Sequence, residues 1–323
     1  MSHFLITGVA GFIASETAAQ LLDQGHTVLG IDNLNNYYDI RIKEYRLAKL
    51  QARQGFVFKK VDIEDLVALE KCFETSKPQA VFNLAARAGV RYSMENPHVY
   101  LSTNTLGTLN LMEAMRTGGV KKMVLASTSS LYAGQKMPFR EDLPVNTPIS
   151  PYAATKKGAE AMAYSYHNLY NLDISIVRYF TVFGPAGRPD MCIFRFIKWI
   201  DEGLPIELFG DGSQSRDFTY VTDIARGTIL ASKPLGYEIV NLGGGQNPIS
   251  LNTVIGWIEE RLGREAKIDR QPFHQADIKE TWADISKAER LLDWKPQVGV
   301  REGVDATVDW YCENRSWLRN VQL

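Results

Sequence analysis

The segment Thr7-Gly8-Val9-Ala10-Gly11-Phe12-Ile13-Ala14 decides the fold prediction, because it links an apolar run to a helical pattern. The apolar run, Phe4–Thr7, is typical of a buried strand, and the helical pattern begins at Phe12. Glycine at positions 8 and 11 permits a tight turn and leaves room for a phosphate to approach the backbone. The N–H groups at the start of the helix can bind that phosphate. The spacing therefore predicts a strand–turn–helix unit that binds a phosphate group.

Strand and helix patterns alternate strictly through the first half of the chain. Short apolar runs predict buried strands at Phe4–Thr7, Thr27–Ile31, Phe56–Lys60, Ala80–Asn83, Lys122–Ala126 and Ile174–Tyr179. Helical patterns lie between them, at about Phe12–Gln24, Arg41–Gln54, Asp65–Ser76, Thr103–Thr117 and Tyr152–Tyr170. This alternation predicts βαβ units, and therefore a parallel sheet with right-handed crossovers.

The pattern becomes less regular after about residue 180, where proline and glycine cluster at Gly184–Pro189. Further helices are predicted at Asn252–Leu262, Ser286–Leu292 and Arg301–Asn314. We therefore predict an α/β fold, a Rossmann-type doubly wound parallel sheet with a smaller mixed α/β lobe at the C-terminal side. Residues 1–180 form the Rossmann domain in this prediction, with a further strand and helix from about 215–245. Residues 181–323 form mainly the second lobe, which is discontinuous.

Charge and cysteine content argue against several classes of protein. The chain has 36 Lys and Arg residues against 37 Asp and Glu residues, so we expect no bulk attraction to nucleic acid or to an anionic membrane. No stretch reaches the roughly 18 apolar residues of a membrane span. The three cysteines and five histidines show no metal-ligand spacing. We therefore expect no metal site, and reduced thiols in a cytoplasmic protein.

An acidic residue at the end of the second predicted strand extends the phosphate-binding unit to a dinucleotide site. Asp32 can accept hydrogen bonds from the adenosine ribose hydroxyls, although a helix cap or a loop acid is the alternative. The next residues, Asn33-Leu34-Asn35, provide no arginine for a 2′-phosphate, so NAD is favoured over NADP. Asp62 follows the third strand, where it is placed either to reach the adenine or to cap the next helix.

A tyrosine and a lysine four residues apart open the helix predicted at Tyr152–Tyr170. The two side chains share one face, and the ammonium of Lys156 is expected to lower the pKa of the Tyr152 phenol. The phenolate could then accept a proton from a hydroxyl group. Upstream, the hydroxyl-rich segment Ser127-Thr128-Ser129-Ser130 follows a parallel strand and so faces the ligand crevice. A surface pair and a capped loop are the structural alternatives for these two features.

Together these pieces resemble the extended short-chain dehydrogenases/reductases, in the branch of nucleotide-sugar epimerases and dehydratases. The matching segments cover nearly the whole chain: Thr7–Ala14, Asp32-Asn33, Asn83–Ala86, Asn104, Thr128, Tyr152 with Lys156, Arg178–Thr181 and Gly210–Phe218. The resemblance implies that Thr128, Tyr152 and Lys156 are the catalytic residues. It implies that NAD is bound by Gly8, Gly11, Phe12, Ile13, Asp32, Asn33, Asp62, Ile63, Leu84, Ala85, Ala86, Asn104, Tyr152, Lys156 and Tyr179, with Asn104 as a brace for the active-site helix.

Within this branch, three segments resemble the UDP-glucuronate 4-epimerases in particular: Ala88–Ser93, Phe180–Pro185 and Gly187–Met191. The chain departs from their pattern at Ala14 and Ala133, where glycine is usual, and at Ala186, where arginine is common. The resemblance implies NAD-dependent 4-epimerisation of a UDP-sugar through a transient 4-keto intermediate, from UDP-glucuronate to UDP-galacturonate. UDP-glucose and UDP-N-acetylglucosamine stay open as alternative substrates.

The resemblance also implies which residues bind the substrate: Arg91, Ser129, Ser130, Thr181, Arg188, Arg195, Arg216 and Asp277. Arg188, with Thr181 and Ser129, is the candidate clamp for a carboxylate, because a guanidinium fork suits this group. Arg195 and Arg216 are the candidates for binding the diphosphate.

Two other classes of function stay open at this point. A dehydratase or decarboxylase on the same scaffold would carry an acid after Thr128, whereas Ser129-Ser130 stand there. A non-catalytic NAD-binding regulator would be expected to lack the tyrosine–lysine pair, which is present. The family resemblance also implies a homodimer, joined through the helices at Thr103–Thr117 and Tyr152–Tyr170.

Overall fold

The computed structural model describes residues 1–245, 248–273 and 278–323. Its central sheet has seven parallel strands in the order β11-β6-β5-β4-β1-β2-β3. The strands are β1 (His3–Thr7), β2 (Thr27–Asp32), β3 (Phe56–Lys60), β4 (Ala80–Asn83), β5 (Lys122–Thr128), β6 (Asp173–Tyr179) and β11 (Tyr237–Leu242). The strand order reverses between β1 and β4, and ligands bind at such a point, outside the carboxyl ends of the strands. The predicted doubly wound parallel sheet is therefore confirmed.

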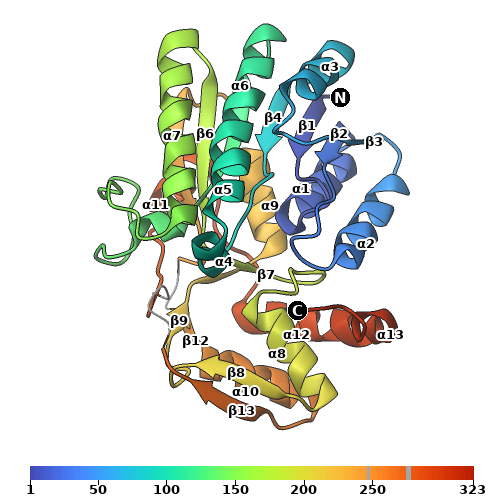
Figure 1. The fold of residues 1–323 in the computed structure, drawn as a ribbon, viewed down its shortest axis with the longest axis vertical. Helices are drawn as coiled ribbons and strands as arrows, with labels where there is room; N and C mark the ends of the chain where they lie inside the picture. Colours follow the sequence, from blue (N-terminus) through green and yellow to red (C-terminus); the bar gives the residue numbers. More distant parts are fainter. Residues whose placement is uncertain (246–247, 274–277) are drawn as a thin grey trace.

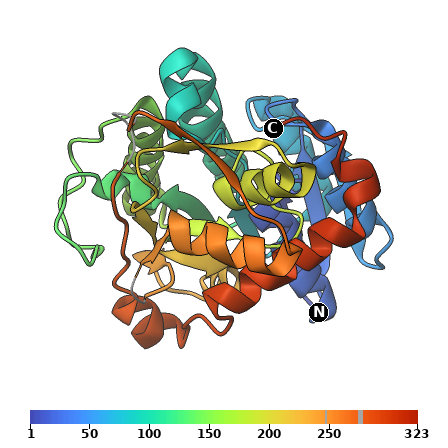
Figure 2. The ribbon, with the colours of Figure 1, turned by 90° about the horizontal axis from the view of Figure 1, so that it is seen from below.

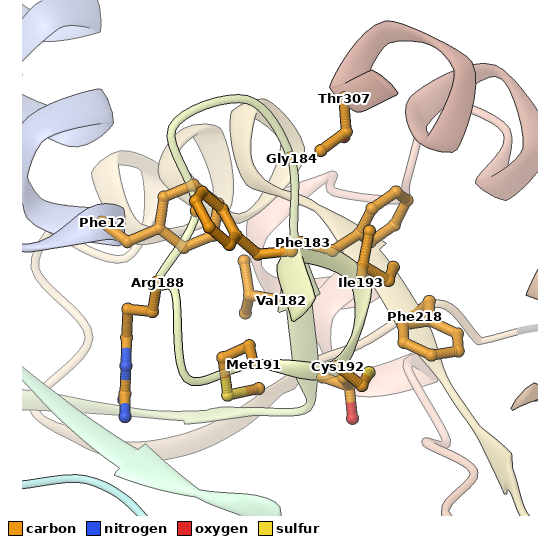
Figure 3. A pocket seen from close by; sticks show the side chains of 13 residues that line it. Phe12, Val182, Phe183, Gly184, Arg188, Met191, Cys192, Ile193, Phe218 and Thr307 are labelled. Carbon is orange, nitrogen blue, oxygen red and sulfur yellow. The ribbon is translucent and has the colours of Figure 1, made fainter. Parts of the chain in front are cut away.

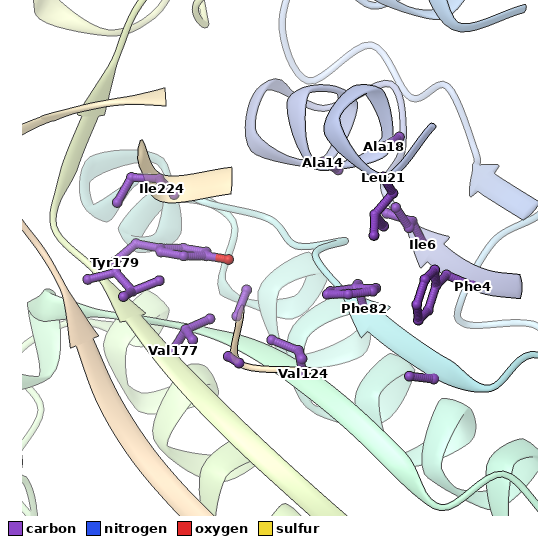
Figure 4. Packing of buried hydrophobic residues seen from close by; sticks show 14 of the residues in the cluster. Phe4, Ile6, Ala14, Ala18, Leu21, Phe82, Val124, Val177, Tyr179 and Ile224 are labelled. Atoms are coloured by element: carbon purple, nitrogen blue, oxygen red, sulfur yellow. The ribbon is translucent and has the colours of Figure 1, made fainter. Parts of the chain in front are cut away.

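Helices cover both faces of this sheet (Figure 1). One face carries α1 (Phe12–Asp23), α2 (Ile40–Gln51), α9 (Val221–Leu230) and α11 (Ser286–Leu292), and the other carries α3 (Leu66–Ser76), α6 (Gly107–Thr117) and α7 (Pro151–Tyr170). Successive side chains of a strand point to opposite faces. Phe4 and Ile6 of β1 therefore pack in one core and Leu5 in the other. Figure 4 shows the first core, in which Ala14, Ala18 and Leu21 of α1 pack over the sheet.

The segment between β4 and α6 is more irregular than the single helix predicted at Thr103–Thr117. It contains α4 (Val90–Glu95), α5 (Pro97–Tyr100) and a π-helical turn, η1 (Leu101–Leu106), before α6 begins. Pro97 takes the first position of α5, where its missing N–H costs nothing. π-helical turns of this kind often occur at functional sites, and η1 carries Asn104 into contact with α7.

The second lobe lies at one end of the molecule, below the sheet in Figure 1 and in front in Figure 2. Its strands pair as β7 (Thr181–Phe183) with β10 (Phe218–Tyr220), β8 (Pro205–Phe209) with β13 (Lys267–Gln271), and β9 (Ser215–Arg216) with β12 (Ile249–Ser250). Its helices are α8 (Cys192–Glu202), α10 (Leu251–Leu262), α12 (Val300–Glu313) and α13 (Arg315–Leu318). They share one apolar core, to which Ile42 of α2 also belongs. The described residues thus form a mixed α/β lobe, as predicted, while the boundary near residue 180 stays a prediction.

Two searches of the described residues bear on the classes of function considered above. No helix in the described part of the chain combines the length and the apolar character needed to cross a membrane. Within the same residues, no group of three or more His, Cys, Asp or Glu side chains is arranged to hold a metal ion. The three cysteines are free thiols, and Cys72 is buried.

Candidate active site

A cleft of about 730 Å³ lies at the carboxyl ends of the strands and extends to the second lobe. It brings together nearly all the site residues predicted from the sequence. They are Gly8, Gly11, Phe12, Ile13, Asp32, Asn33, Asp62, Ile63, Leu84, Ala85, Ala86, Tyr179, Thr128, Tyr152, Lys156, Arg91, Ser129, Ser130, Thr181, Arg188, Arg195 and Arg216. Asn104 does not line the cleft, and Asp277 lies outside the described residues.

The glycine-rich turn at one end of the cleft has no room for side chains. Gly8 has a φ of 67°, and a Cβ there would lie 2.7 Å from the Cα of Ala85. A Cβ on Gly11 would lie 2.8 Å from the carbonyl oxygen of Gly8. Gly11 also precedes α1 without any side-chain cap on the helix, so its first N–H groups face the cleft uncapped. The turn therefore has the shape and polarity that a pyrophosphate requires.

The acidic residues beyond β2 and β3 form the next part of the cleft. Asp32 accepts backbone hydrogen bonds from Ala10 N at 3.1 Å and from Leu34 N at 2.8 Å, which fixes its carboxylate at the end of β2. Asp62 accepts a hydrogen bond from Asn33 Nδ2 at 2.8 Å. The N-cap of α3 is Asp65 and not Asp62, so the capping alternative for Asp62 is wrong.

Asn104 is committed to protein partners. Its Oδ1 accepts from Arg87 N at 2.9 Å, and its Nδ2 donates to Arg87 O at 2.9 Å and to Thr155 Oγ1 at 3.1 Å. The side chain is 1% exposed. Asn104 therefore braces α7 against the segment after β4, as expected, but it does not reach the cleft as a cofactor ligand.

Three side chains meet where β5 ends and α7 begins. Ser150 caps α7 by accepting from Ala153 N, and this start places Tyr152 on the first turn, facing the cleft. Tyr152 and Thr128 are joined by a side-chain hydrogen bond, and Thr128 also donates to Ser130 Oγ at 3.1 Å. Lys156 is buried, and its Nζ donates to the carbonyl oxygen of Ala126 at 2.9 Å.

The direction of the Tyr152 pKa differs from the sequence-based prediction. Burial raises the pKa of Tyr152, although the hydrogen bond with Thr128 and the positive charge of Arg188 both act to lower it. Burial also lowers the pKa of Lys156 to about 8, against the opposing effect of Glu160. The prediction was wrong because desolvation of a buried phenol and a buried ammonium disfavours the charged form of each.

Arg188 is held on three sides at the part of the cleft next to Tyr152. Its Nε and NH2 donate to the carboxylate of Asp190 at 3.0 and 2.5 Å, and its guanidinium lies 5.5 and 5.9 Å from the ring centres of Tyr37 and Tyr38. Burial alone would raise the pKa of Asp190, but the adjacent Arg188 holds it below its usual range. Figure 3 shows Arg188 beside a smaller pocket formed by side chains of α1, β7 and α8.

The loop that carries Arg188 is tied to the glycine-rich turn through another arginine, the buried Arg46. Arg46 of α2 donates from Nε to Ala186 O at 2.8 Å and from NH1 to Ala10 O at 3.1 Å. Ala186 has a φ of 54°, in the left-handed region that costs an L-residue about 1 kcal/mol or more. Although alanine stands at position 186, where arginine is common in the family, the loop is still anchored through the backbone carbonyl of Ala186.

Three arginines line the far end of the cleft, in or near the second lobe. The guanidinium of Arg91 lies 4.0 Å from the ring centre of Phe209. Arg195 pairs with Glu207 at 3.3 Å, and its buried Nε has no hydrogen-bond partner among the described residues. Arg216 donates to the carbonyl oxygen of Ser215 at 2.8 Å. This positive lining suits an anionic group such as a diphosphate.

Several cleft residues carry no clear signal in the sequence. Tyr37 donates to Ala88 O at 2.6 Å across 51 positions of the chain. Lys43 of α2 donates to Asn35 O at 2.8 Å, and burial lowers its pKa to about 8. The sequence indicates Asp190 only as a member of the segment Gly187–Met191. The spacing of Arg188 and Asp190, two residues apart, is the one signal that could have identified their pairing.

The chain is similar in sequence and structure to nucleotide-sugar enzymes over almost its whole length. A family model described as GDP-mannose 4,6 dehydratase matches residues 5–307. The UDP-glucuronate 4-epimerase of Thermodesulfobacterium geofontis is 58% identical over 323 residues, which is 100% of both chains. The crystal structure of UDP-glucuronic acid 4-epimerase from Bacillus cereus, in complex with UDP-glucuronic acid and NAD, has a TM-score of 0.91 and 36% identity, covering 97% of this chain and 99% of that chain. UDP-glucose 4-epimerase from Thermotoga maritima, with UDP-glucose, has a TM-score of 0.88 and 29% identity, covering 97% of this chain and 99% of that chain. The chain therefore belongs to the GDP-mannose 4,6-dehydratase family of extended short-chain dehydrogenases/reductases.

Proposed function

We propose that this protein is a UDP-glucuronate 4-epimerase, which interconverts UDP-glucuronate and UDP-galacturonate with the aid of NAD. The observation that carries the proposal is the position of Arg188. It is fixed by Asp190 and lies close enough to Tyr152 to lower the pKa of the phenol. A cation held beside the catalytic tyrosine suits a sugar that bears a carboxylate next to its reacting carbon. The full-length similarity to UDP-glucuronate 4-epimerases supports the same substrate.

The residues of the cleft fit NAD. A Cβ on Gly8 or Gly11 would fill the space that the pyrophosphate needs, and Asp32 offers its carboxylate to the adenosine ribose. Tyr152 and Lys156 line the same cleft, and the proposal puts the nicotinamide end and the sugar beside them. The chemistry that NAD would supply when bound is reversible hydride transfer at C4; return of the hydride to the opposite face of the 4-keto sugar would invert this carbon without net oxidation.

Tyr152 and Thr128 move the proton of the 4-hydroxyl in this proposal. Tyr152 accepts the proton as general base and returns it when the other epimer forms. Thr128, through its hydrogen bond with Tyr152, orients or relays that proton. Because burial disfavours the phenolate, cations around Tyr152 are needed. Arg188 acts on Tyr152 in this way, and Lys156 lies one helical turn away on the same face of α7.

Arg188 also has a second role in this proposal, which is to prevent decarboxylation of a uronate. Oxidation at C4 makes a β-keto acid, which readily loses carbon dioxide. Asp190 accepts from two of the five N–H groups of Arg188, and remaining N–H groups can bind the sugar carboxylate. Thr181 and Ser129 line the same part of the cleft. Firm binding of the carboxylate keeps it out of the geometry that decarboxylation requires.

The residues after Thr128 argue against a dehydratase or a decarboxylase. The related 4,6-dehydratases have an aspartate and a glutamate at the positions that Ser129 and Ser130 occupy here. Both serines line the cleft, but a hydroxyl cannot replace a carboxyl group as the proton donor for loss of water. The description of the matching family model as a dehydratase therefore does not extend to the reaction of this chain.

The direct test is incubation of the purified protein with UDP-glucuronate and NAD, followed by NMR of the products. The proposal expects UDP-galacturonate, with no carbon dioxide released. A pentose product would make the enzyme a decarboxylase. Turnover of UDP-glucose or UDP-N-acetylglucosamine, with none of UDP-glucuronate, would assign a neutral substrate instead.

We also infer that the protein is a homodimer that works in the cytoplasm. Large apolar side chains are exposed on η1 and α7, two elements that pack together: Leu101 and Tyr164 at 56%, Leu106 at 46% and Leu169 at 65%. Apolar surface of this kind is typical of protein interfaces, and its placement supports the homodimer that the family resemblance implies. The three free thiols support a reducing compartment.

Light scattering after size-exclusion chromatography tests the dimer. Leu106→Glu is expected to give a monomer, whereas Val57→Glu, at a residue that is also 56% exposed but lies on strand β3, is expected to leave the dimer intact. A monomeric wild-type protein would contradict the inference.

A further inference from the structure

A buried ion pair lies directly behind the catalytic residues. Glu160 stands four positions after Lys156 and eight after Tyr152 on α7, so the three side chains occupy one side of the helix. Its Oε1 accepts from Ser127 Oγ at 2.7 Å and from Arg178 Nε at 2.9 Å, and its Oε2 accepts from Arg178 NH2 at 2.8 Å. The two charged side chains are 2% and 1% exposed. Because this ion pair is buried and does not line the cleft, its role is expected to lie in the residues that it holds in place.

The pair connects α7 to the end of β5, where the catalytic residues meet. Three consecutive residues of β5 each hold a residue of α7: Ala126 O accepts from Lys156, Ser127 donates to Glu160, and Thr128 is hydrogen-bonded to Tyr152. Arg178 extends the connection to β6 and to Tyr132, whose OH accepts from NH1 at 2.8 Å. The position of Thr128 relative to Tyr152 therefore depends on the contact between Ser127 and Glu160.

The charge of Glu160 acts on Lys156. Burial lowers the pKa of Lys156 to about 8, and Glu160 is the neighbouring group that opposes this effect. Glu160 is the group that acts on Lys156, and Arg188, Tyr37 and Tyr100 are the titratable groups next to Tyr152. Behind them, Lys157 from α7 and Arg178 from β6 pair with Glu160, and Tyr132 from η2 (Ser129–Tyr132) lies against Arg178. Among these described groups, Glu160 alone carries a formal negative charge. Arg178 supplies the opposite charge that a buried carboxylate requires.

We propose that Glu160, held by Arg178, is a positioning residue for the epimerisation: it keeps Lys156 in its charged form and fixes the end of β5 so that Thr128 meets Tyr152. This inference rests on the proposed function only in that the protein must turn over a UDP-sugar with Tyr152 as base. A neutral Lys156 would remove the positive charge that lies one helical turn beyond Tyr152 on the same face of α7. Glu160 does not line the cleft, and it acts through Lys156 and Ser127.

Two variants separate the charge of Glu160 from its position. Glu160→Gln keeps the length of the side chain and an oxygen for Ser127 but removes the charge. We expect kcat to fall about tenfold and the apparent pKa that Lys156 contributes to the kcat profile to fall by about one unit. KM for the UDP-sugar is expected to stay unchanged. Ser127→Ala keeps the charge, and we expect a lower kcat with no change in that apparent pKa.

A wild-type pH profile in Glu160→Gln, or an equal displacement in Ser127→Ala, would overturn the proposal. If Glu160→Gln does not fold because Arg178 is left unpaired, the variant Glu160→Gln/Arg178→Met decides instead, since apolar replacements of buried pairs are often tolerated. Its apparent pKa for Lys156 must also lie below that of the wild type, and an unchanged value refutes the role of the charge. All profiles are compared on whichever UDP-sugar the wild-type protein converts. A wrong substrate would then appear in the wild-type products and not in this comparison.

Discussion

Replacement of Arg188 by methionine tests the carboxylate clamp. The side chain is 18% exposed, lies over Tyr37 and is paired with Asp190, so methionine of similar length keeps much of the packing while the charge is lost. A charge-assisted hydrogen bond contributes about 1.5–3 kcal/mol. We therefore expect kcat/KM for UDP-glucuronate to fall about 10- to 150-fold. The affinity of the NAD-loaded enzyme for UDP-glucose, which carries no carboxylate, is expected to change less than about threefold.

The same substitution should change the pH dependence and the product ratio. Arg188 acts to lower the pKa of Tyr152, so its loss raises that pKa further. Because Tyr152 must lose a proton to act as base, the apparent pKa that Tyr152 contributes to the kcat profile is expected to rise. A carboxylate that is no longer held should also be lost more often, so we expect a larger share of carbon dioxide per turnover.

Arg140→Met is a matched control for this experiment. Arg140 pairs with Asp142 at 2.8 Å, with the same spacing of two residues, but both side chains are more than half exposed and neither lines the cleft. Its loss is expected to leave all four measured quantities unchanged. Isothermal titration and NMR-monitored turnover supply the data. Equal losses for UDP-glucuronate and UDP-glucose in Arg188→Met, or no loss for either, would refute the clamp.

Three further substitutions test other parts of the account. Gly8→Ala is expected to weaken NAD binding at least tenfold, because the new Cβ would meet the backbone of Ala85. Gly25 has a similar φ of 77° but open space around it, so the control variant Gly25→Ala should bind NAD as the wild type does. Burial raises the pKa of Asp217 from 3.8 to about 7. The protonated Asp217 side chain therefore contributes in full to the free energy of unfolding below about pH 4. This contribution, up to about 4 kcal/mol, is lost as the pH rises to about 7. Denaturant titrations at several pH values should show this slope, and Asp217→Asn should reduce it; an unchanged slope would exclude Asp217 as its cause. Arg216→Ala is expected to raise KM about tenfold or more with little effect on kcat, and an unchanged apparent affinity would remove Arg216 from the diphosphate site.

The sequence predicted most of what depends on local pattern. The alternation of apolar runs and helical segments is read from neighbouring residues, and all six predicted strands of the sheet occur, with β5 extending two residues further to Thr128. The glycine-rich turn was recognisable because only residues without side chains fit a turn beside a phosphate. The helix α8 (Cys192–Glu202) was not predicted, because it directly follows a region of proline and glycine that reads as a loop.

The features missed from the sequence depend on tertiary contacts. Tyr37 reaches the carbonyl oxygen of Ala88 from a loop 51 residues away, and no local pattern records this. The direction of the Tyr152 pKa depends on burial, which a spacing of four residues does not reveal. The position of Asn104 depends on the π-helical turn η1, which turns its amide toward Thr155 and away from the cleft. In each case the residue could be identified in the sequence, but the residues that surround it in the fold could not.

The central claim is that C4 of the sugar is oxidised and reduced within one closed site, and UDP-glucuronate carrying deuterium at C4 tests it most directly. The substrate is incubated with the NAD-loaded protein in ordinary water, and the product is analysed by NMR and mass spectrometry. The account predicts UDP-galacturonate that retains the deuterium at C4, because the hydrogen leaves and returns without exchange with solvent. Loss of the deuterium to water, or inversion at a different carbon, would contradict the account.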